Sequence, residues 1–170
     1  MSMADAPPPQ NERGHERSWK DKWASINSKF DTCTSECITN YRSDDKCKDS
    51  LENVIADIWN LKDWLVKDIT VGVSQADINA FLDTKAFNIS ACGDIETAQK
   101  HSHADSPHRE DTVLTWEGNH DHPSGSPVVF SVIRKYKDNP GNIDRWEDAW
   151  ELVRRAINEW EKFLTEGGLL

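Results

Sequence analysis

The hydrophobic residues of this chain recur at the spacing of amphipathic helices. In three long segments the apolar positions advance mostly by steps of three and four, which places them on one face of a helix. The spacing predicts helices over residues 16–37, 50–68 and 143–166. The first and last stripes consist of Trp19, Trp23, Ile26, Phe30, Cys33 and Cys37, and of Ile143, Trp146, Trp150, Val153, Ile157, Trp160 and Leu164. One-sided stripes of this kind indicate helices that pack around a shared core.

Polar residues mark where two of the helices begin. Asp49 or Ser50 is placed to cap the second long helix, and residues 41–48 before it are typical of a charged connection. Ser74 is placed to cap a short helix over residues 75–82. Each of these residues can accept a hydrogen bond from the first helical turn, where backbone N–H groups lack partners.

The rest of the chain predicts one more helix and a β-hairpin. A helix over residues 88–103 has an inner face of small side chains, which lets a neighbouring helix approach closely. Residues 112–116 and 128–133 are rich in β-branched residues, and the His-, Asp-, Pro- and Gly-rich stretch between them is typical of a long hairpin tip. The sequence therefore predicts a mainly α-helical bundle of about four to five helices, with a β-hairpin inserted before the last helix.

Length and charge limit the classes of protein that this chain fits. Its 170 residues suit one domain over residues 13–170, with a flexible Pro-rich tail over residues 1–12. The net charge of −10 argues against nonspecific nucleic-acid binding and against a polybasic membrane anchor, because both need a positive field. No stretch reaches the roughly 18 apolar residues of a membrane span, and residues 1–10 lack the apolar centre of a signal peptide. We therefore expect a cytoplasmic protein without membrane contact.

The cysteines are expected to stay reduced in such a compartment. They are Cys33, Cys37, Cys47 and Cys92. Disulfides are rare in the cytosol, so Cys33 and Cys37, which lie four residues apart in a predicted helix, are expected to be buried thiols. No Cys-x-x-Cys pair occurs, which leaves a zinc ribbon or a thioredoxin-like centre without support.

Two short segments carry polar residues that suit a functional site. The first, over residues 58–65, reads Ile-Trp-Asn-Leu-Lys-Asp-Trp-Leu, so that two tryptophans bracket Asn60, Lys62 and Asp63. Because offsets of three and four are neighbours on a helix, Asn60 and Asp63 share one face with Lys67.

The second segment, over residues 92–101, reads Cys-Gly-Asp-Ile-Glu-Thr-Ala-Gln-Lys-His. Asp94 and His101 lie seven positions apart, which is two helical turns along the same face. Lys100 adds a cation next to His101.

Together the two segments resemble a group of bacterial and phage helical proteins. That group carries a Trp-His-Leu-Lys-Asp-Trp-like helix and then a Cys-x-Asp-Ile-Ala-Asn-x-x-Lys-His-like helix, and the likeness covers most of residues 17–166. The group is in turn similar to the HEPN class of helical bundles, many of which are metal-independent ribonucleases of toxin–antitoxin or phage-defence systems and act as dimers. This chain departs from the pattern at Asn60, where the group has a histidine. It also lacks the Arg-x(4–6)-His pair of active HEPN domains, and Asp94 stands near the place of that arginine.

The resemblance implies a catalytic set for RNA cleavage without a metal. The candidate catalytic residues are His101, Lys100, Asp94, Lys62, Asp63 and Asn60. His101 suits the base that takes the 2′-hydroxyl proton, because histidine changes protonation near neutral pH. Lys100 or Lys62 would be the cation near the phosphate, and Asp94 or Asp63 would orient the imidazole. The alternative is that Lys100 and His101 form a solvated helix C-terminus, where positive side chains favour the helix dipole.

A histidine-rich stretch offers a weaker alternative, a metal site. Its candidate ligands are His103, His108, His120 and His122, interleaved with aspartates. Imidazole and carboxylate sets bind zinc or harder divalent ions. A solvated polar loop is the other interpretation, and no cofactor is expected.

Three functions from different classes remain open. The first is a HEPN-like metal-independent ribonuclease that acts on RNA in a toxin or phage-defence module. The second is a catalytically inactive HEPN-like protein that works by dimerisation or by binding a protein partner, which the missing Arg–His pair favours. The third is an acidic inhibitor that mimics nucleic acid, which only the net charge supports. A homodimer is expected because Trp59 and Trp64 lie off the main stripe of their helix, and exposed indoles favour interfaces.

Overall fold

The computed structural model describes residues 18–39, 44–101, 112–118, 130–136 and 145–170. They form five α-helices, one π-helical turn and a small antiparallel sheet. The helices are α1 (Trp19–Thr34), α2 (Asp44–Lys67), α3 (Gln75–Thr84), α4 (Phe87–His101) and α5 (Ala149–Glu166), and the π-helical turn η1 (Ser35–Thr39) follows α1. The strands are β1 (Thr112–Gly118), β2 (Phe130–Tyr136) and β3 (Arg145–Asp148). The predicted mainly helical fold is thus confirmed, and the predicted tail over residues 1–12 lies outside the described residues.

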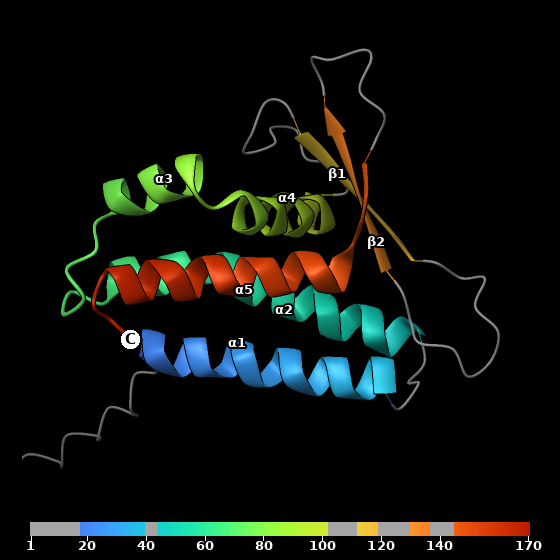
Figure 1. Cartoon of the computed structure of the whole chain (residues 1–170), viewed down its shortest axis with the longest axis horizontal. Coiled ribbons are helices and arrows are strands. Elements are labelled where there is room, and N and C mark those ends of the chain that lie inside the picture. Colours follow the sequence, from blue (N-terminus) through green and yellow to red (C-terminus); the bar gives the residue numbers. More distant parts are fainter. Residues whose placement is uncertain (1–17, 40–43, 102–111, 119–129, 137–144) are drawn as a thin grey trace, which may run out of the picture.

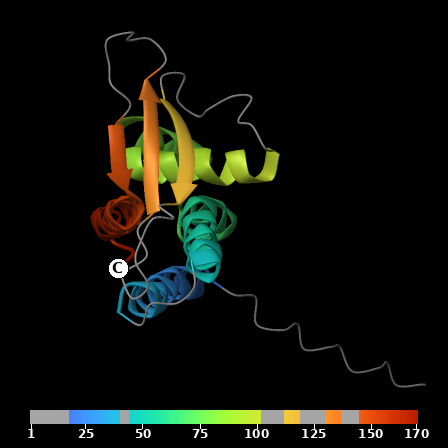
Figure 2. The ribbon, with the colours of Figure 1, turned by 90° about the vertical axis from the view of Figure 1, so that its right-hand side faces the viewer.

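The helices form a layered bundle with the sheet at one end. Helices α2 and α5 lie side by side between α1 on one side and α3 with α4 on the other (Figure 1). The three strands lie across α4 and beside the beginning of α5, in the order β1-β2-β3 (Figure 2). Among the described helices, none combines the length and the apolar character needed to cross a membrane.

The buried face of α5 forms the centre of the core. Its buried side chains are Ala149, Trp150, Leu152, Val153, Ala156, Ile157, Trp160 and Leu164. Trp160 is fully buried, and its indole N–H donates to the backbone carbonyl of Ile58 at 2.9 Å, which satisfies the one polar atom of the ring. Phe81 of α3 packs on the same tryptophan, with ring centroids 5.4 Å apart. The stripe predicted for the last helix is therefore core from Trp150 onward.

The predicted start of that last helix is wrong. Residues 145–148 form strand β3, in which Trp146 pairs with Ile133 of β2, and α5 begins only at Ala149. Asp148 ends the strand and caps the helix, because its carboxylate accepts a hydrogen bond from the backbone N–H of Glu151 at 3.0 Å. Trp146 falls on the three-four spacing because a four-residue strand leads directly into the helix.

The predicted start of α2 is also wrong. The helix begins at Asp44, so most of the stretch expected as a connection, residues 41–48, is helical where it is described. The carboxylate of Asp45 in the first turn interacts favourably with the positive end of the helix dipole. Lys48 and Glu52 then form an ion pair at the i, i+4 spacing.

The hairpin and the short helix are confirmed. Strands β1 and β2 pair antiparallel from Thr112 opposite Tyr136 to Gly118 opposite Phe130. Ser74 caps α3 in a capping box, accepting from the backbone N–H of Asp77 while the Asp77 carboxylate accepts from the N–H of Ser74.

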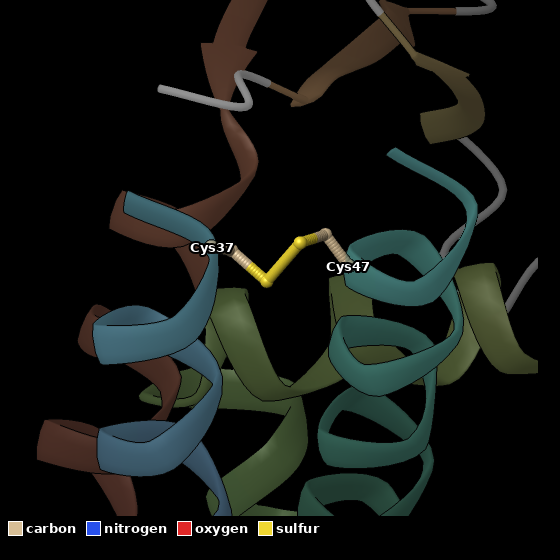
Figure 3. Close-up of a disulfide and its surroundings, with 2 residues drawn as sticks. All are labelled: Cys37 and Cys47. Carbon is tan, nitrogen blue, oxygen red and sulfur yellow. A yellow bond between two sulfur atoms is a disulfide. The ribbon is translucent and has the colours of Figure 1, made fainter. Parts of the chain in front are cut away.

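Cysteine pairing contradicts the expectation of reduced thiols. Cys37 in η1 and Cys47 in the first turns of α2 form a disulfide, with 5.7 Å between their Cα atoms (Figure 3). The prediction failed because it was argued from the compartment, whereas the antiparallel packing of α1 and α2 brings these two positions face to face. Cys33 and Cys92 are buried and take no part in the disulfide, as expected for Cys33. A disulfide is typical of oxidising compartments, and the cytoplasmic location stays a prediction.

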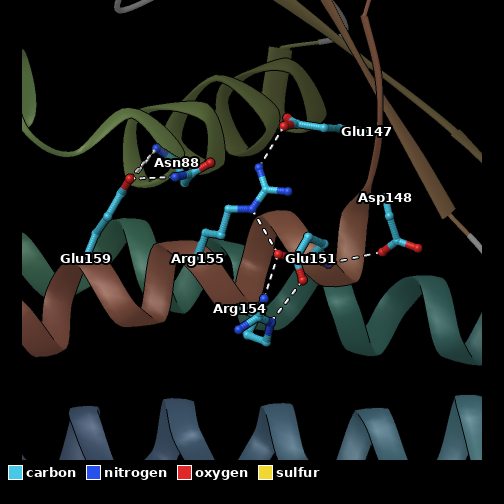
Figure 4. Close-up of polar contacts among 7 residues, drawn as sticks. All are labelled: Asn88, Glu147, Asp148, Glu151, Arg154, Arg155 and Glu159. Atoms are coloured by element: carbon cyan, nitrogen blue, oxygen red, sulfur yellow. Dashed lines mark hydrogen bonds and ion pairs between the residues drawn. The ribbon is translucent and has the colours of Figure 1, made fainter.

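A carboxylate of α5 fixes the beginning of α4. Glu159 accepts hydrogen bonds from the backbone N–H groups of Asn88 and Ile89, both at 3.0 Å, and from the Asn88 side chain (Figure 4). The Glu159 carboxylate therefore accepts hydrogen bonds from N–H groups of the first helical turn, which have no partner within the helix. Its negative charge also interacts favourably with the positive end of the helix dipole. On the same face of α5, Arg155 lies between Glu147 and Glu151. The Glu159 contacts thus hold α4 against α5, and the contact between Arg155 and Glu147 holds β3 against α5.

Candidate functional site

The two polar segments singled out in the sequence meet where α2 crosses α4. The indole of Trp59 lies directly on Gly93, so closely that a Cβ added there would be 2.7 Å from two ring atoms. Real Cβ atoms essentially never approach that closely, so the contact depends on a residue without a side chain. Trp59 is only 7% exposed, so little of its indole is accessible to a partner, although one of Trp59 and Trp64 was expected to face one. Trp64 is half-buried against the core.

A pocket of about 390 Å³ opens beside this contact. We call it the α2–α3–α4 pocket, and its lining residues are Trp59, Lys62, Gln75, Asn79, Leu82, Asp83 and Ser90. It combines one cation, one carboxylate, two amides and a hydroxyl with the apolar surface of an indole and a leucine. Such a mixture suits the binding of a molecule or side chain that has both a polar and an apolar part.

Lys62 is the only one of the six predicted catalytic residues among these lining residues. Its ammonium group lies 4.2 Å from the centroid of the Trp59 ring and 3.3 Å from the carboxylate of Asp63. The side chain is 16% exposed, so the charge is partly shielded from water. A cation over an indole is stabilised by the negative face of the ring. The charge of Lys62 is thus directed at its own chain.

The other predicted catalytic residues lie around the α2–α4 crossing. Asn60 is half-buried on α2, and Asp94 follows Gly93 on α4 with 4% of its surface exposed. Lys100 and His101 are the last residues of α4, and their side chains lie outside the described part of the chain. The structure therefore brings the α2 segment against the beginning of the α4 segment.

The weaker metal alternative falls outside the described residues. This holds for all its candidate ligands, His103, His108, His120 and His122. Within the residues that the structure does describe, no cluster of three or more His, Cys, Asp or Glu side chains is placed to hold a metal ion.

The sequence did not single out the contribution of α3 to the pocket. Gln75, Asn79 and Asp83 recur every four residues and form one polar face of this short helix. The side chain of Gln75 donates to that of Asn79 at 2.9 Å, which orders the two amides. The spacing was visible in the sequence, but nothing in it showed that this face would lie over Trp59 and Ser90.

Phe87 is an exposed aromatic residue on the same helix as Ser90. It is 52% accessible and stands three positions before Ser90, so the two residues are neighbours on one face of α4. Ser90 itself is buried, and its hydroxyl donates to the backbone carbonyl of Leu82 at 3.3 Å. A large aromatic side chain thus lies in contact with solvent about one helical turn from a residue that lines the pocket.

A second polar recess runs between α1 and α2. We call it the α1–α2 groove; its volume is about 480 Å³ and its lining residues are Ser28, Lys29, Thr32, Cys33, Glu36, Ser50 and Asn53. Close to it, Asp57 accepts hydrogen bonds from Lys22 and from Lys29, the latter at 2.6 Å. Burial alone would raise the pKa of Asp57, but the hydrogen bonds and charges of the two lysines outweigh it and lower the pKa.

Comparisons with known proteins found no family model, no curated protein and no solved structure that matches this chain. The resemblance to HEPN domains therefore stays a prediction from the two sequence segments.

Proposed function

We propose that this protein is a catalytically inactive, HEPN-like binding protein that forms a homodimer through the α2–α3–α4 pocket and Phe87. The observation that carries the proposal is the exposed ring of Phe87, about one helical turn before Ser90, which lines a pocket with both apolar and polar groups. Aromatic side chains that insert into a facing pocket dominate the binding energy of many interfaces.

A second copy of this chain fits the pocket for two reasons. In a two-fold dimer the same patch contacts itself, so that each Phe87 can enter the pocket of the other copy. The pocket also carries two amide side chains, Gln75 and Asn79, and an amide both donates and accepts hydrogen bonds, so a patch placed against itself can pair donors with acceptors.

Sedimentation velocity over the micromolar range tests the proposal. We expect the wild-type chain to shift from monomer to dimer with rising concentration, and Phe87→Ser to stay monomeric at the same concentrations. Ile69→Ser is the matched control, because Ile69 is 92% exposed in the connection between α2 and α3 and does not line the pocket. A wild-type chain that stays monomeric, or equal effects of the two variants, would count against this function.

A ribonuclease is the second candidate function, and the contact between Trp59 and Gly93 favours it. The contact sets side by side the two segments that carry the resemblance. In that function His101 is the base, Lys62 or Lys100 the cation, and Asp94 or Asp63 the residue that orients the imidazole. We rank it second because Asp94 is buried and Lys62 already contacts Trp59 and Asp63.

A further inference from the structure

The disulfide lies at one end of the α1–α2 groove. Glu36, which lines the groove, directly precedes Cys37, and Ser50, which lines the opposite wall, stands three residues after Cys47. Figure 3 shows the two cysteines facing each other across the ends of the paired helices. The covalent bond therefore joins the two walls of the groove at this end.

Ion pairs hold the two walls together farther along. Asp57 of α2 accepts from Lys22 and Lys29 of α1, and Lys29 is itself a lining residue. These contacts do not depend on the redox state of the chain. Loss of the disulfide would therefore release one end of the groove while the Asp57 contacts still hold α1 against α2.

A third cysteine lies inside the groove. Cys33 is not part of the disulfide and lines the groove, although only 3% of its surface is exposed. It stands about one helical turn before Cys37, and Cys37 belongs to η1, a π-helical turn. Such turns are rare and occur frequently at functional sites. A thiol with little exposure at the wall of a recess becomes reactive when the recess widens, because attack requires contact with the sulfur.

We propose that the Cys37–Cys47 disulfide is a redox switch that controls access to the α1–α2 groove and to the thiol of Cys33. In the oxidised chain the disulfide holds η1 against the first turns of α2, and Cys33 at the wall of the groove is only 3% exposed. In the reduced chain η1 separates from these turns, and the groove admits a small polar molecule that reaches Cys33. The hydroxyl, amide and charged groups of the groove wall suit such a molecule.

Reduction of the switch by a dithiol is a balanced exchange. A thiolate of the reductant attacks one cysteine sulfur, forms a mixed disulfide and releases the other cysteine as a thiolate. The second thiol of the reductant then displaces the first cysteine and closes the disulfide of the reductant. Two electrons pass from the dithiol to the protein, and each released cysteine thiolate takes up a proton. Because Cys37 and Cys47 are 1% and 0% exposed, the first attack requires local opening of this end of the groove.

Alkylation of the full chain by iodoacetamide, with peptide mass spectrometry, tests the switch. The rate of labelling at Cys33 is measured in the oxidised chain, in the chain reduced with dithiothreitol, and in the double variant Cys37→Ser/Cys47→Ser. Reduction and the double variant are each expected to raise the Cys33 rate by about tenfold or more, as local opening does. Cys92 is the internal control, because it is a buried cysteine outside the disulfide, on α4 and not among the lining residues of the groove.

Two results would overturn the proposal. Equal rates at Cys33 in the oxidised and reduced chains would show that the disulfide does not control the groove. A parallel rise at Cys33 and Cys92 would show that its loss loosens the whole fold. If the double variant fails to fold, the labelling rate at Cys33 in the reduced wild-type chain still tests the proposal.

Discussion

At the scale of single residues, the contact between Trp59 and Gly93 sets how closely α2 approaches α4. A methyl group at position 93 would lie 2.7 Å from the indole. Alanine is favoured over glycine within a helix by up to about 1 kcal/mol, but overpacking a filled interior costs about 1–3 kcal/mol. We therefore expect Gly93→Ala to lower the free energy of unfolding by about 1–2 kcal/mol, measured by urea denaturation.

The same substitution in a Trp59→Leu background isolates the contact. Leucine is smaller than tryptophan and leaves room for the methyl group, so the cost of Gly93→Ala should fall or change sign there. If Gly93→Ala stabilises the otherwise wild-type chain, the two helices do not meet as described.

Trp59 and Cys37 each have a contact that the sequence of their own helix could not predict. Trp59 lies off the apolar stripe of its own helix, and it is buried because a glycine of another helix makes room for it. Cys37 has the spacing of a buried thiol, and its bond to Cys47 follows from the packing of α1 on α2. In both cases the deciding partner is distant in the sequence or on another helix, so the pattern within one helix does not contain it.

At the scale of elements, the pairing of α1 with α2 should depend on pH through Asp57. The pKa of this carboxyl is lowered from its ordinary value of 3.8: burial raises it, and the hydrogen bonds from Lys22 and Lys29 more than offset this. The stabilisation is therefore fully present above about pH 3.8, the unfolded value, and is lost as the pH falls through the lower folded value. We expect Asp57→Asn to cost about 1–2 kcal/mol at neutral pH and less in acid.

Denaturation curves of the wild type and of Asp57→Asn, at neutral pH and below pH 3.8, test this pH dependence of stability. Asp31→Asn is the control, since Asp31 is an exposed acid on the same pair of helices, and its removal should change little at either pH. An Asp57→Asn chain that loses as much stability on acidification as the wild type would show that Asp57 does not carry the effect.

The helices and the hairpin could be predicted because an element that buries one face has hydrophobic residues at a regular spacing in the sequence. The boundary between β3 and α5 could not be predicted, because Trp146 in the strand and Trp150 in the helix lie four residues apart, which is a helical spacing. What marks the border is Asp148, whose carboxylate caps the helix. The start of α2 was missed for a related reason, since residues 44–48 carry no long apolar stripe and are helical together with the disulfide-bonded Cys47.

At the scale of the whole molecule, the candidate site depends on how three helices lie together. The α2–α3–α4 pocket takes Lys62 from a segment that the sequence singled out and Asn79 from one that it did not. Periodicity predicts which face of a helix is buried but not which other helix covers it. The α2 residues of the site could therefore be predicted from the sequence, whereas the α3 wall and the role of Phe87 required the fold.

Incubation of the full chain with single-stranded RNA, with and without EDTA, separates the two candidate functions. We expect no cleavage in either condition, because the chain lacks the Arg-x(4–6)-His pair, Asp94 is buried, and Lys62 contacts Trp59 and Asp63. Cleavage that persists in EDTA and falls by about 10²–10⁴-fold in His101→Ala, but not in His15→Ala, would make the ribonuclease the function, since removal of a general base has that effect. Cleavage that survives His101→Ala and disappears with EDTA would instead place the chemistry in the histidine-rich stretch, because a bound metal ion can supply the hydroxide that replaces such a base.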